Sequence, residues 1–210
     1  MRKGRFITFE GGEGAGKSTQ IRLLSDALDE RGIAHVLTRE PGGTKGAEAL
    51  RALLLDPGHD WGAQAESLLF AAARADHVAK LIRPALADGK WVLCDRYLDS
   101  SRAYQGGAGG MGDDQVTALH AIGSEGLLPD RTLLLELDPE EASRRTQVRD
   151  TSGADRIGGK GPDYHAMVRD RFRILAEQEP DRFVRIDAGG PPEVVHGRIM
   201  AALGPLLTAV

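Results

Sequence analysis

A glycine-rich segment near the N-terminus constrains the fold of this chain more than any other feature. Residues 11–18 read GGEGAGKS, which matches the spacing G-x-x-x-x-G-K-[ST]. The segment follows a strand-like run at 5–10 and precedes helical spacing over 17–31, which is the context that the motif requires. The glycines let successive backbone N–H groups point at phosphate oxygens, and the helix N-terminus adds a partial positive charge. The pattern predicts a loop for the phosphates of a nucleoside triphosphate, made of Gly11, Gly12, Glu13, Gly14, Ala15, Gly16, Lys17, Ser18 and Thr19.

Strand-like and helix-like runs alternate along the rest of the chain. Further strands are expected at 34–38, 91–95, 131–137 and 183–187. Helices are expected at 44–55, 63–87 with a bend near Pro84, 114–124, from 138 onward, 163–179 and 191–207. Residues 150–162 are rich in Gly, Asp and Ser, which is typical of a mobile loop. The alternation predicts a parallel sheet with helices on both faces.

Composition and charge argue against several classes of protein. The formal net charge of -4 is unfavourable for a broad nucleic-acid-binding surface, although a few arginines can still form a cationic pocket. The chain has no run of 18 apolar residues, and the apolar stretch behind its basic N-terminus is too short for a signal peptide. The single cysteine, Cys94, excludes an intrachain disulfide. We therefore expect a cytoplasmic protein with neither nucleic acid nor a membrane as its partner.

Two polar clusters follow predicted strands. Arg39 comes at the end of the second strand, in the segment 38–44, and points toward the crevice where parallel sheets bind ligands. Asp95 and Arg96 end the third strand, where the carboxylate can hold a magnesium ion together with Ser18 of the glycine-rich loop. Each cluster also has a plainer interpretation, a solvated turn for the first and a mutual Asp–Arg pair for the second.

A third cluster lies on predicted helices. Phe70 and Arg74 are four residues apart, so they share a helix face, and an aromatic ring beside a guanidinium can bind a base. The alternative is a core phenylalanine and a surface arginine. Beyond the third strand, three polar residues fall at helical spacing and could line one wall of a site: Ser101, Tyr104 and Gln105.

Taken together, these motifs resemble the thymidylate kinase family. The likeness covers residues 6–187, and its specific elements are the loop with Glu13 inside it, the segments 38–44 and 72–74, and 95–97 followed by 103–106. The resemblance implies a three-layer α/β P-loop NTPase fold in one domain over residues 1–210. It implies a five-stranded parallel sheet flanked by helices, with a mobile lid at about 150–162. It also implies a homodimer.

The resemblance assigns roles to residues of the acceptor site. It implies that Phe70 stacks on thymine, that Arg74 contacts its O4, and that Glu13 lies near the 3′-hydroxyl of the sugar. The acceptor phosphate would be held by Arg39 and Arg96, with Arg51 beside them. Ser101 and Gln105 would complete the pocket.

The implied reaction is transfer of the γ-phosphoryl group of ATP to thymidine monophosphate (dTMP), which gives dTDP and ADP for dTTP synthesis. The acceptor phosphate is already ionised at neutral pH, with a second pKa near ~6, so the reaction needs charge neutralisation and no general base. Lys17 and Mg²⁺, held at Ser18 and Asp95, would serve the donor. The phosphate loop contains no arginine, so the lid residue Arg156 is expected to supply the catalytic cation.

Two other functions remain open at this stage. The same scaffold could phosphorylate another small acceptor, such as uridylate, cytidylate or a nucleoside. A protein of a different class, a nucleotide-dependent regulatory switch, would also carry the glycine-rich loop. The chain has no N-K-x-D-type guanine motif, and its arginines gather where a second anion would lie, which favours a kinase.

Overall fold

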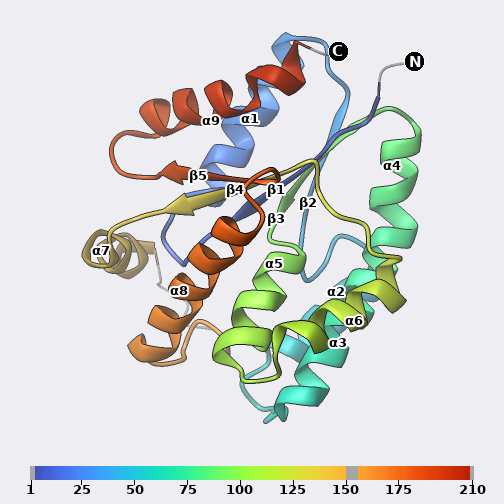
Figure 1. Ribbon diagram of the computed structural model, residues 1–210, viewed down its shortest axis with the longest axis vertical. Coiled ribbons are helices and arrows are strands. Elements are labelled where there is room, and N and C mark those ends of the chain that lie inside the picture. Colours follow the sequence, from blue (N-terminus) through green and yellow to red (C-terminus); the bar gives the residue numbers. More distant parts are fainter. Residues whose placement is uncertain (1–2, 150–155, 209–210) are drawn as a thin grey trace.

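The computed structural model describes residues 3–149 and 156–208, and a five-stranded parallel sheet forms its centre (Figure 1). The strands lie in the order β2-β3-β1-β4-β5. Their bounds are Phe6–Glu10 (β1), His35–Arg39 (β2), Trp91–Asp95 (β3), Arg131–Glu136 (β4) and Phe183–Asp187 (β5). The prediction of an α/β fold with this sheet is confirmed, with strand ends that shift by one residue at most.

Helices make up most of the remaining described chain. Their bounds are Lys17–Glu30 (α1), Lys45–Leu55 (α2), Ala63–His77 (α3), Val78–Ile82 (η1), Arg83–Ala87 (α4), Leu98–Ser101 (α5), Arg102–Ala108 (η2), Asp113–Ser124 (α6), Pro139–Arg149 (α7), Pro162–Gln178 (α8) and Pro192–Leu207 (α9). The long helix expected at 63–87 is a continuous α3–η1–α4 path. Its irregularity is the π-helical turn η1, which ends before Pro84, because proline lacks the N–H that the regular ladder needs.

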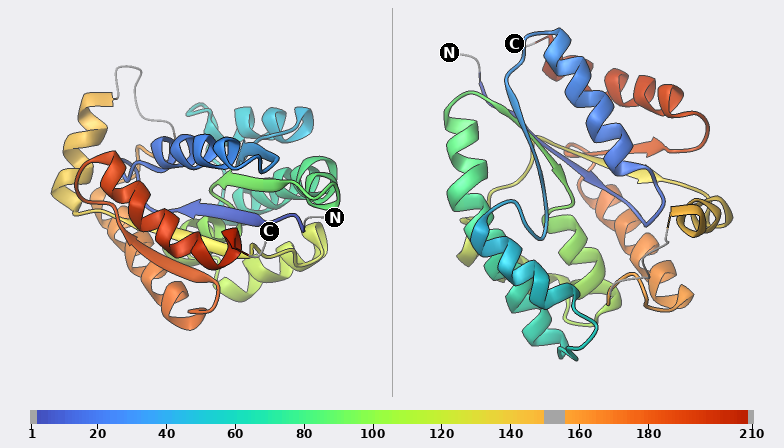
Figure 2. Two further views of the ribbon diagram at one scale, coloured as in Figure 1. Left: turned by 90° about the horizontal axis from the view of Figure 1, so that it is seen from above. Right: turned by 180° about the vertical axis from the view of Figure 1, so that it is seen from behind.

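The helices form one layer on each face of the sheet. One layer contains α1 and α9, whose apolar side chains, such as Leu24 and Ile199, pack on Ile7, Phe9 and Leu133. The other contains the α3–η1–α4 path together with α5, η2, α6 and α8, and α2 packs on α3 (Figures 1 and 2). Each layer is closed by an apolar stripe that faces the sheet, as hydrophobic burial requires.

The carboxyl ends of three adjacent strands converge at one edge of the sheet. In the register of the sheet, Arg39 of β2 and Phe9 of β1 both lie opposite Asp95 of β3. The glycine-rich loop leaves from Glu10, the last residue of β1. Parallel pairing therefore brings segments far apart in the sequence to one crevice, as the strand-end argument predicted.

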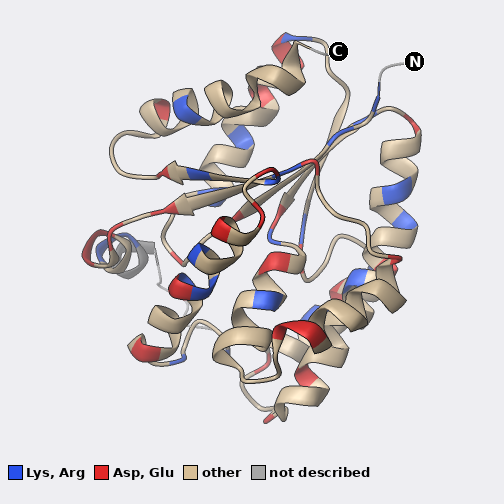
Figure 3. Ribbon diagram, viewed as in Figure 1, with Lys and Arg blue, Asp and Glu red and all other residues tan. Residues whose placement is uncertain are grey.

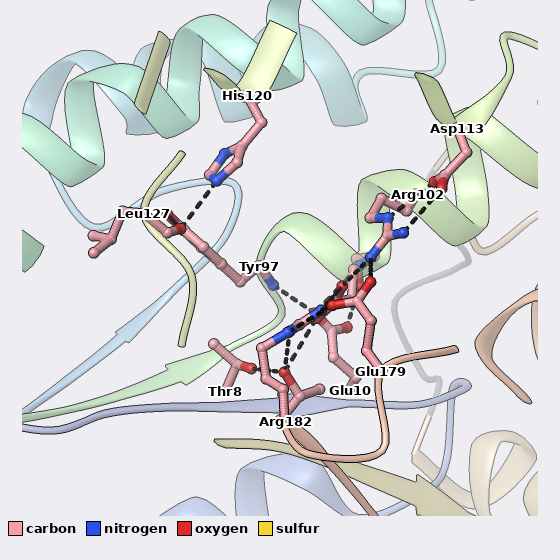
Figure 4. Close-up of polar contacts among 12 residues, drawn as sticks. Thr8, Glu10, Tyr97, Arg102, Asp113, His120, Leu127, Glu179 and Arg182 are labelled. Carbon is pink, nitrogen blue, oxygen red and sulfur yellow. Dashed lines mark hydrogen bonds and ion pairs between the residues drawn. The ribbon is translucent and has the colours of Figure 1, made fainter. Parts of the chain in front are cut away.

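A buried ionic network holds the segment after β3, which forms one wall of this crevice, to neighbouring elements (Figure 4). Asp99 is fully buried and accepts hydrogen bonds from both guanidinium NH groups of Arg182, at 2.6 and 2.9 Å, and from Thr132 Oγ1 at 3.1 Å. Arg102 lies 3.4 Å from Asp99 and also pairs with Asp113. The network ties α5 and η2 to β4, to α6 and to the residue before β5.

Charged residues of both signs are mingled along the helices (Figure 3). This agrees with the small net charge of -4. Among the described residues, no helix is both long enough and apolar enough to cross a membrane.

Candidate active site

A cleft opens at the carboxyl ends of β1, β2 and β3, and it encloses about 1000 Å³ when its open mouth is counted. Its walls come from the glycine-rich loop, the segment after β2, helices α2 and α3, and the segment that follows β3. The lining residues are Glu13, Gly14, Gly16, Lys17, Ser18, Arg39, Glu40, Pro41, Arg51, Leu55, Phe70, Arg74, Asp95, Arg96, Tyr97, Ser100, Ser101, Tyr104, Gln105, Ile157 and Gly158. Of the predicted site residues, Gly11, Gly12, Ala15, Thr19 and Arg156 do not line it.

The glycine-rich loop has the backbone that its sequence predicts. Gly11 has φ 133°, and a side chain there would meet the carbonyl oxygen of Leu135 at 2.4 Å, so only glycine fits. Gly16 has φ 88° and is the N-cap of α1, which begins at Lys17. The loop thus turns tightly into a helix N-terminus, which is the arrangement that binds phosphate groups.

Lys17 is buried at the floor of the cleft. Its Nζ donates to the carbonyl oxygens of Gly11 at 3.2 Å and Gly12 at 2.9 Å. Burial and the neighbouring Arg96 lower the pKa of Lys17 to about 8, against the opposing pull of nearby carboxylates. The ammonium is therefore mostly protonated at neutral pH, because its pKa lies only slightly above this pH.

Ser18 and Asp95 lie side by side at the mouth of the loop. The Ser18 hydroxyl donates to Asp95 Oδ2 at 3.1 Å. A hydroxyl and a carboxylate are oxygen ligands of the kind that Mg²⁺ prefers, and Mg²⁺ usually keeps several waters besides. Within residues 3–149 and 156–208, no group of three or more His, Cys, Asp or Glu could hold a metal ion. The pair fits an ion that arrives with a nucleotide better than a resident one.

Arg96 connects the glycine-rich loop to the segment after β3. Its guanidinium lies 2.6 Å from Glu13 Oε1, donates to the Gly11 carbonyl oxygen at 3.1 Å and to Ser100 Oγ at 3.2 Å. Arg96 lowers the pKa of Glu13 to about 2. The backbone of Arg96 has φ 66°, which is rare for a residue with a side chain and is found preferentially at functional sites.

Glu10 is hydrogen-bonded to the segment that follows Arg96. It is fully buried, and its carboxylate accepts from the Tyr97 N–H at 2.8 Å and from the Ser100 hydroxyl at 2.6 Å (Figure 4). Burial and then the neighbouring Asp99 raise the pKa of Glu10 to about 7. The sequence predicted no role for Glu10, although it is an acidic residue at a strand end, as Asp95 is.

Arg39 and Arg51 line the opposite wall. Arg39, with half of its side chain exposed, is 3.1 Å from Glu48 Oε2, and Arg51 donates to the Pro41 carbonyl oxygen at 2.9 Å. Together with Arg96 they place three guanidinium groups around the cleft.

Arg74 is buried, so the alternative of a surface arginine is wrong. Its Nε donates to Glu40 Oε2 at 2.7 Å, and one NH2 group donates to the Ser101 hydroxyl at 2.8 Å. Glu40 also meets His77 Nδ1 at 3.0 Å. Glu40 lies within the segment 38–44, and the sequence predicted no separate role for it, although it is a carboxylate beside a strand end.

Gln105 and Tyr104 extend this wall on η2. Gln105 Nε2 donates to Glu66 Oε1 at 2.8 Å, and the Tyr104 ring lies 5.2 Å from the Arg96 guanidinium carbon. Both side chains are buried and both line the cleft, as their helical spacing predicted. Phe70 lines the cleft as well.

The predicted lid at 150–162 falls partly outside the described residues, which omit 150–155. Arg156 Nε donates to the Leu54 carbonyl oxygen at 2.8 Å. Its NH2 group lies 2.6 Å from Glu66 Oε2 as an ion pair without hydrogen-bond alignment. The guanidinium therefore contacts α2 and α3 rather than the glycine-rich loop.

Comparison with known proteins places this cleft in a family. A family model described as thymidylate kinase matches residues 9–199. The chain is 56% identical over 205 residues to a thymidylate kinase of Rhizorhabdus wittichii, covering 97% of this chain and 99% of that protein. It is 52% identical over 204 residues to one of Rhodopseudomonas palustris, covering 96% and 89%.

A solved structure supports the same assignment. The crystal structure of thymidylate kinase from Ehrlichia chaffeensis matches with a TM-score of 0.74 and 32% identity, covering 96% of this chain and 99% of that one. The family resemblance seen in the sequence is thereby confirmed. The chain belongs to the thymidylate kinase family.

Proposed function

We propose that the cleft carries out the family's reaction with the donor at the glycine-rich loop and the acceptor between the arginines and α3. Membership of the family assigns this enzyme the ATP-dependent phosphorylation of dTMP to dTDP. The observation that best supports this assignment of residues is the set of contacts made by Arg96. This guanidinium, in the segment after β3, contacts the donor loop at both the Gly11 carbonyl oxygen and the Glu13 carboxylate.

The donor half consists of the loop, Lys17 and the Ser18–Asp95 pair. The N–H groups of the loop and the N-terminus of α1 would bind the phosphates of ATP. Lys17 would turn its ammonium from the carbonyls of Gly11 and Gly12 toward the outer phosphates. Ser18 and Asp95 would hold Mg²⁺, which neutralises phosphate charge when bound.

The acceptor half consists of Arg39, Arg51 and Arg96. Two anionic phosphates repel each other, so bringing them into line requires cations on the acceptor. The three guanidinium groups surround the cleft and would hold the dTMP phosphate. Because this phosphate is already ionised, with a second pKa near ~6, no side chain has to remove a proton.

The base end of the acceptor site lies on α3 and η2. Phe70 would stack on thymine, and Arg74 would donate to O4, with Ser101, Tyr104 and Gln105 closing the pocket. This assignment is supported by their common position in the cleft and by the 2.8 Å hydrogen bond from Arg74 to Ser101.

Arg156 would supply the cation that stabilises the transferring group. To do so it has to leave Glu66 and Leu54 and swing toward the loop, so the lid at about 150–162 would move during the cycle. The remaining expectations are one domain over residues 1–210, a cytoplasmic location and a homodimer. Exposed apolar side chains such as Leu68 and Ile122 are compatible with the last.

The experiment is ADP release from ATP and Mg²⁺ with dTMP, dUMP, UMP, CMP, thymidine or no acceptor. Strong turnover with dTMP, weaker turnover with dUMP and almost none without acceptor is the expected result. Faster turnover with another acceptor would overturn the assignment of the base pocket. Hydrolysis at the same rate with and without acceptor would overturn the kinase reaction itself.

A further inference from the structure

Two helices face each other across the base end of the cleft, and two hydrogen bonds join them. Glu66, Phe70 and Arg74 fall four residues apart on α3, so they share one stripe of that helix. Ser101 and Gln105 are likewise four apart where α5 runs into η2. One hydrogen bond joins Arg74 to Ser101 at 2.8 Å, and the other joins Gln105 to Glu66, also at 2.8 Å.

Phe70 lies between these two hydrogen bonds along the stripe of α3. A flat ring stacked on Phe70 is therefore flanked by the Arg74–Ser101 pair on one side and by the Gln105–Glu66 pair on the other. Each pair can offer the ring only those hydrogen-bond donors and acceptors that do not already have a partner in the protein. These donors and acceptors decide which edge of a base can be bound.

Arg74 presents a donor. Its Nε is used by Glu40 at 2.7 Å, and one of its NH2 groups is used by Ser101 and by the Tyr97 carbonyl oxygen at 3.3 Å. The second NH2 group has no acceptor among residues 3–149 and 156–208. A guanidinium can only donate, so this side of the pocket offers N–H groups.

Gln105 presents an acceptor, and Glu66 is the reason. An amide side chain can turn either its NH2 or its oxygen toward a neighbour, but an ionised carboxylate accepts only. Glu66 is buried, and its Oε1 accepts the hydrogen bond from Gln105 Nε2 at 2.8 Å. The NH2 of Gln105 must face it, and Oε1 of Gln105 is left without a donor among the described residues.

We propose that Glu66, which lies behind the pocket, sets base specificity by fixing the amide of Gln105 so that the pocket offers one donor and one acceptor. This inference rests on the proposed function. Thymine and uracil present an acceptor, O4, next to a donor, N3–H, and so match Arg74 and Gln105 in that order. Cytosine presents an amino donor next to the acceptor N3, so both contacts are reversed. Glu66 is thus a positioning residue that acts through Gln105.

The test is Glu66→Gln, measured as kcat/KM for dTMP, dUMP and dCMP. The glutamine can donate to Oε1 of Gln105 and turn its NH2 into the pocket, where it faces the N3 acceptor of cytosine. We expect the dTMP-to-dCMP ratio of kcat/KM to fall about tenfold. Where dCMP turnover is too slow, its inhibition constant against dTMP gives the same ratio. The dTMP-to-dUMP ratio is expected to stay unchanged, since the two bases share O4 and N3–H.

Two further variants separate specificity from general damage. Ser67→Ala changes the next residue of α3, whose hydroxyl donates to the Ala63 carbonyl oxygen and not to Gln105, and it is expected to leave all ratios unchanged. The double variant Glu66→Gln/Gln105→Glu exchanges the two residues and returns an acceptor to the pocket. We expect it to restore the preference for dTMP over dCMP, and it carries the test if the single variant does not fold.

The outcomes are distinct. An equal loss of activity on all three nucleotides in Glu66→Gln means that Glu66 is only structural, and the inference is then wrong. A wild-type enzyme that does not phosphorylate dTMP would contradict the proposed function instead, whatever the variants do.

Discussion

The guanidinium of Arg96 lies 2.6 Å from the carboxylate of Glu13, and it does so from a backbone position with φ 66°. The contact joins the glycine-rich loop to the segment after β3. A residue with a side chain pays about 1 kcal/mol or more to adopt this backbone conformation, so the surrounding contacts hold it there.

Arg96→Ala is expected to lower kcat/KM for dTMP roughly 100- to 1000-fold, because it removes a cation from the acceptor site. Arg96→Lys is expected to recover only part of this loss, since an ammonium cannot repeat the contacts with Glu13, Gly11 and Ser100. Arg96→Gly is the matched control for the backbone. It should match Arg96→Ala in activity but be more stable by about 1 kcal/mol, because glycine accepts positive φ. Equal stability in urea would contradict the assigned strain.

Arg156→Ala is expected to lower turnover by roughly 10³-fold while changing dTMP affinity little, because its cation acts on the transferring group. The measurement is kcat by ADP release, with dTMP binding followed by calorimetry. Lys160→Ala is the matched control in the same lid, since Lys160 lies over the Tyr164 ring rather than at Glu66. Near-normal turnover in Arg156→Ala would refute the catalytic assignment.

The affinity for ATP is expected to decline in alkaline solution. The pKa of Lys17 is lowered to about 8, so the ammonium is charged below this pH and becomes neutral above it. Attraction for the phosphates is then lost, and the dissociation constant of ATP should rise by up to about tenfold per pH unit above 8. Calorimetric titration between pH 7 and 9.5 checks this. Lys17→Arg stays charged throughout, so its affinity, although lower, should lack this alkaline decline.

Arg182→Met is expected to destabilise the fold by about 3–5 kcal/mol. It leaves the fully buried Asp99 with Arg102 at 3.4 Å as its main remaining cation (Figure 4). Asp99→Asn/Arg182→Met, which also removes the carboxylate charge, should lose less stability than Arg182→Met alone. Urea unfolding measures both, and a larger loss in the double variant would argue against an uncompensated charge as the cause.

Local sequence was enough to predict most of the fold. The central strands β1, β3 and β4 are mostly apolar runs that end in an acidic residue, and the helices carry an apolar stripe on the side that faces the sheet. Both patterns follow from burial against a neighbouring layer. The π-helical turn before Pro84 was not predicted, since it depends on how the freed backbone groups rearrange.

The site was predictable where function demands a residue type at a fixed distance along the chain. The glycine-rich loop, Arg39, Asp95 and Arg96 sit at strand ends, and Phe70 and Arg74 sit four apart on a helix. Glu66 lies at the same spacing before Phe70, but a glutamate on a helix is usually solvated, so the pattern did not single it out. Only packing shows that it is buried against Gln105.

The sequence by itself determined the succession of strands and helices along the chain, the phosphate loop and the family. These depend on short-range patterns and on motifs. The tertiary structure decided which charges are paired. Arg96 pairs with Glu13, Arg74 pairs with Glu40, and Arg156 pairs with Glu66 rather than with the phosphate loop. Such pairings join residues tens of positions apart, and only the packing of helices on the sheet brings their side chains within hydrogen-bond distance.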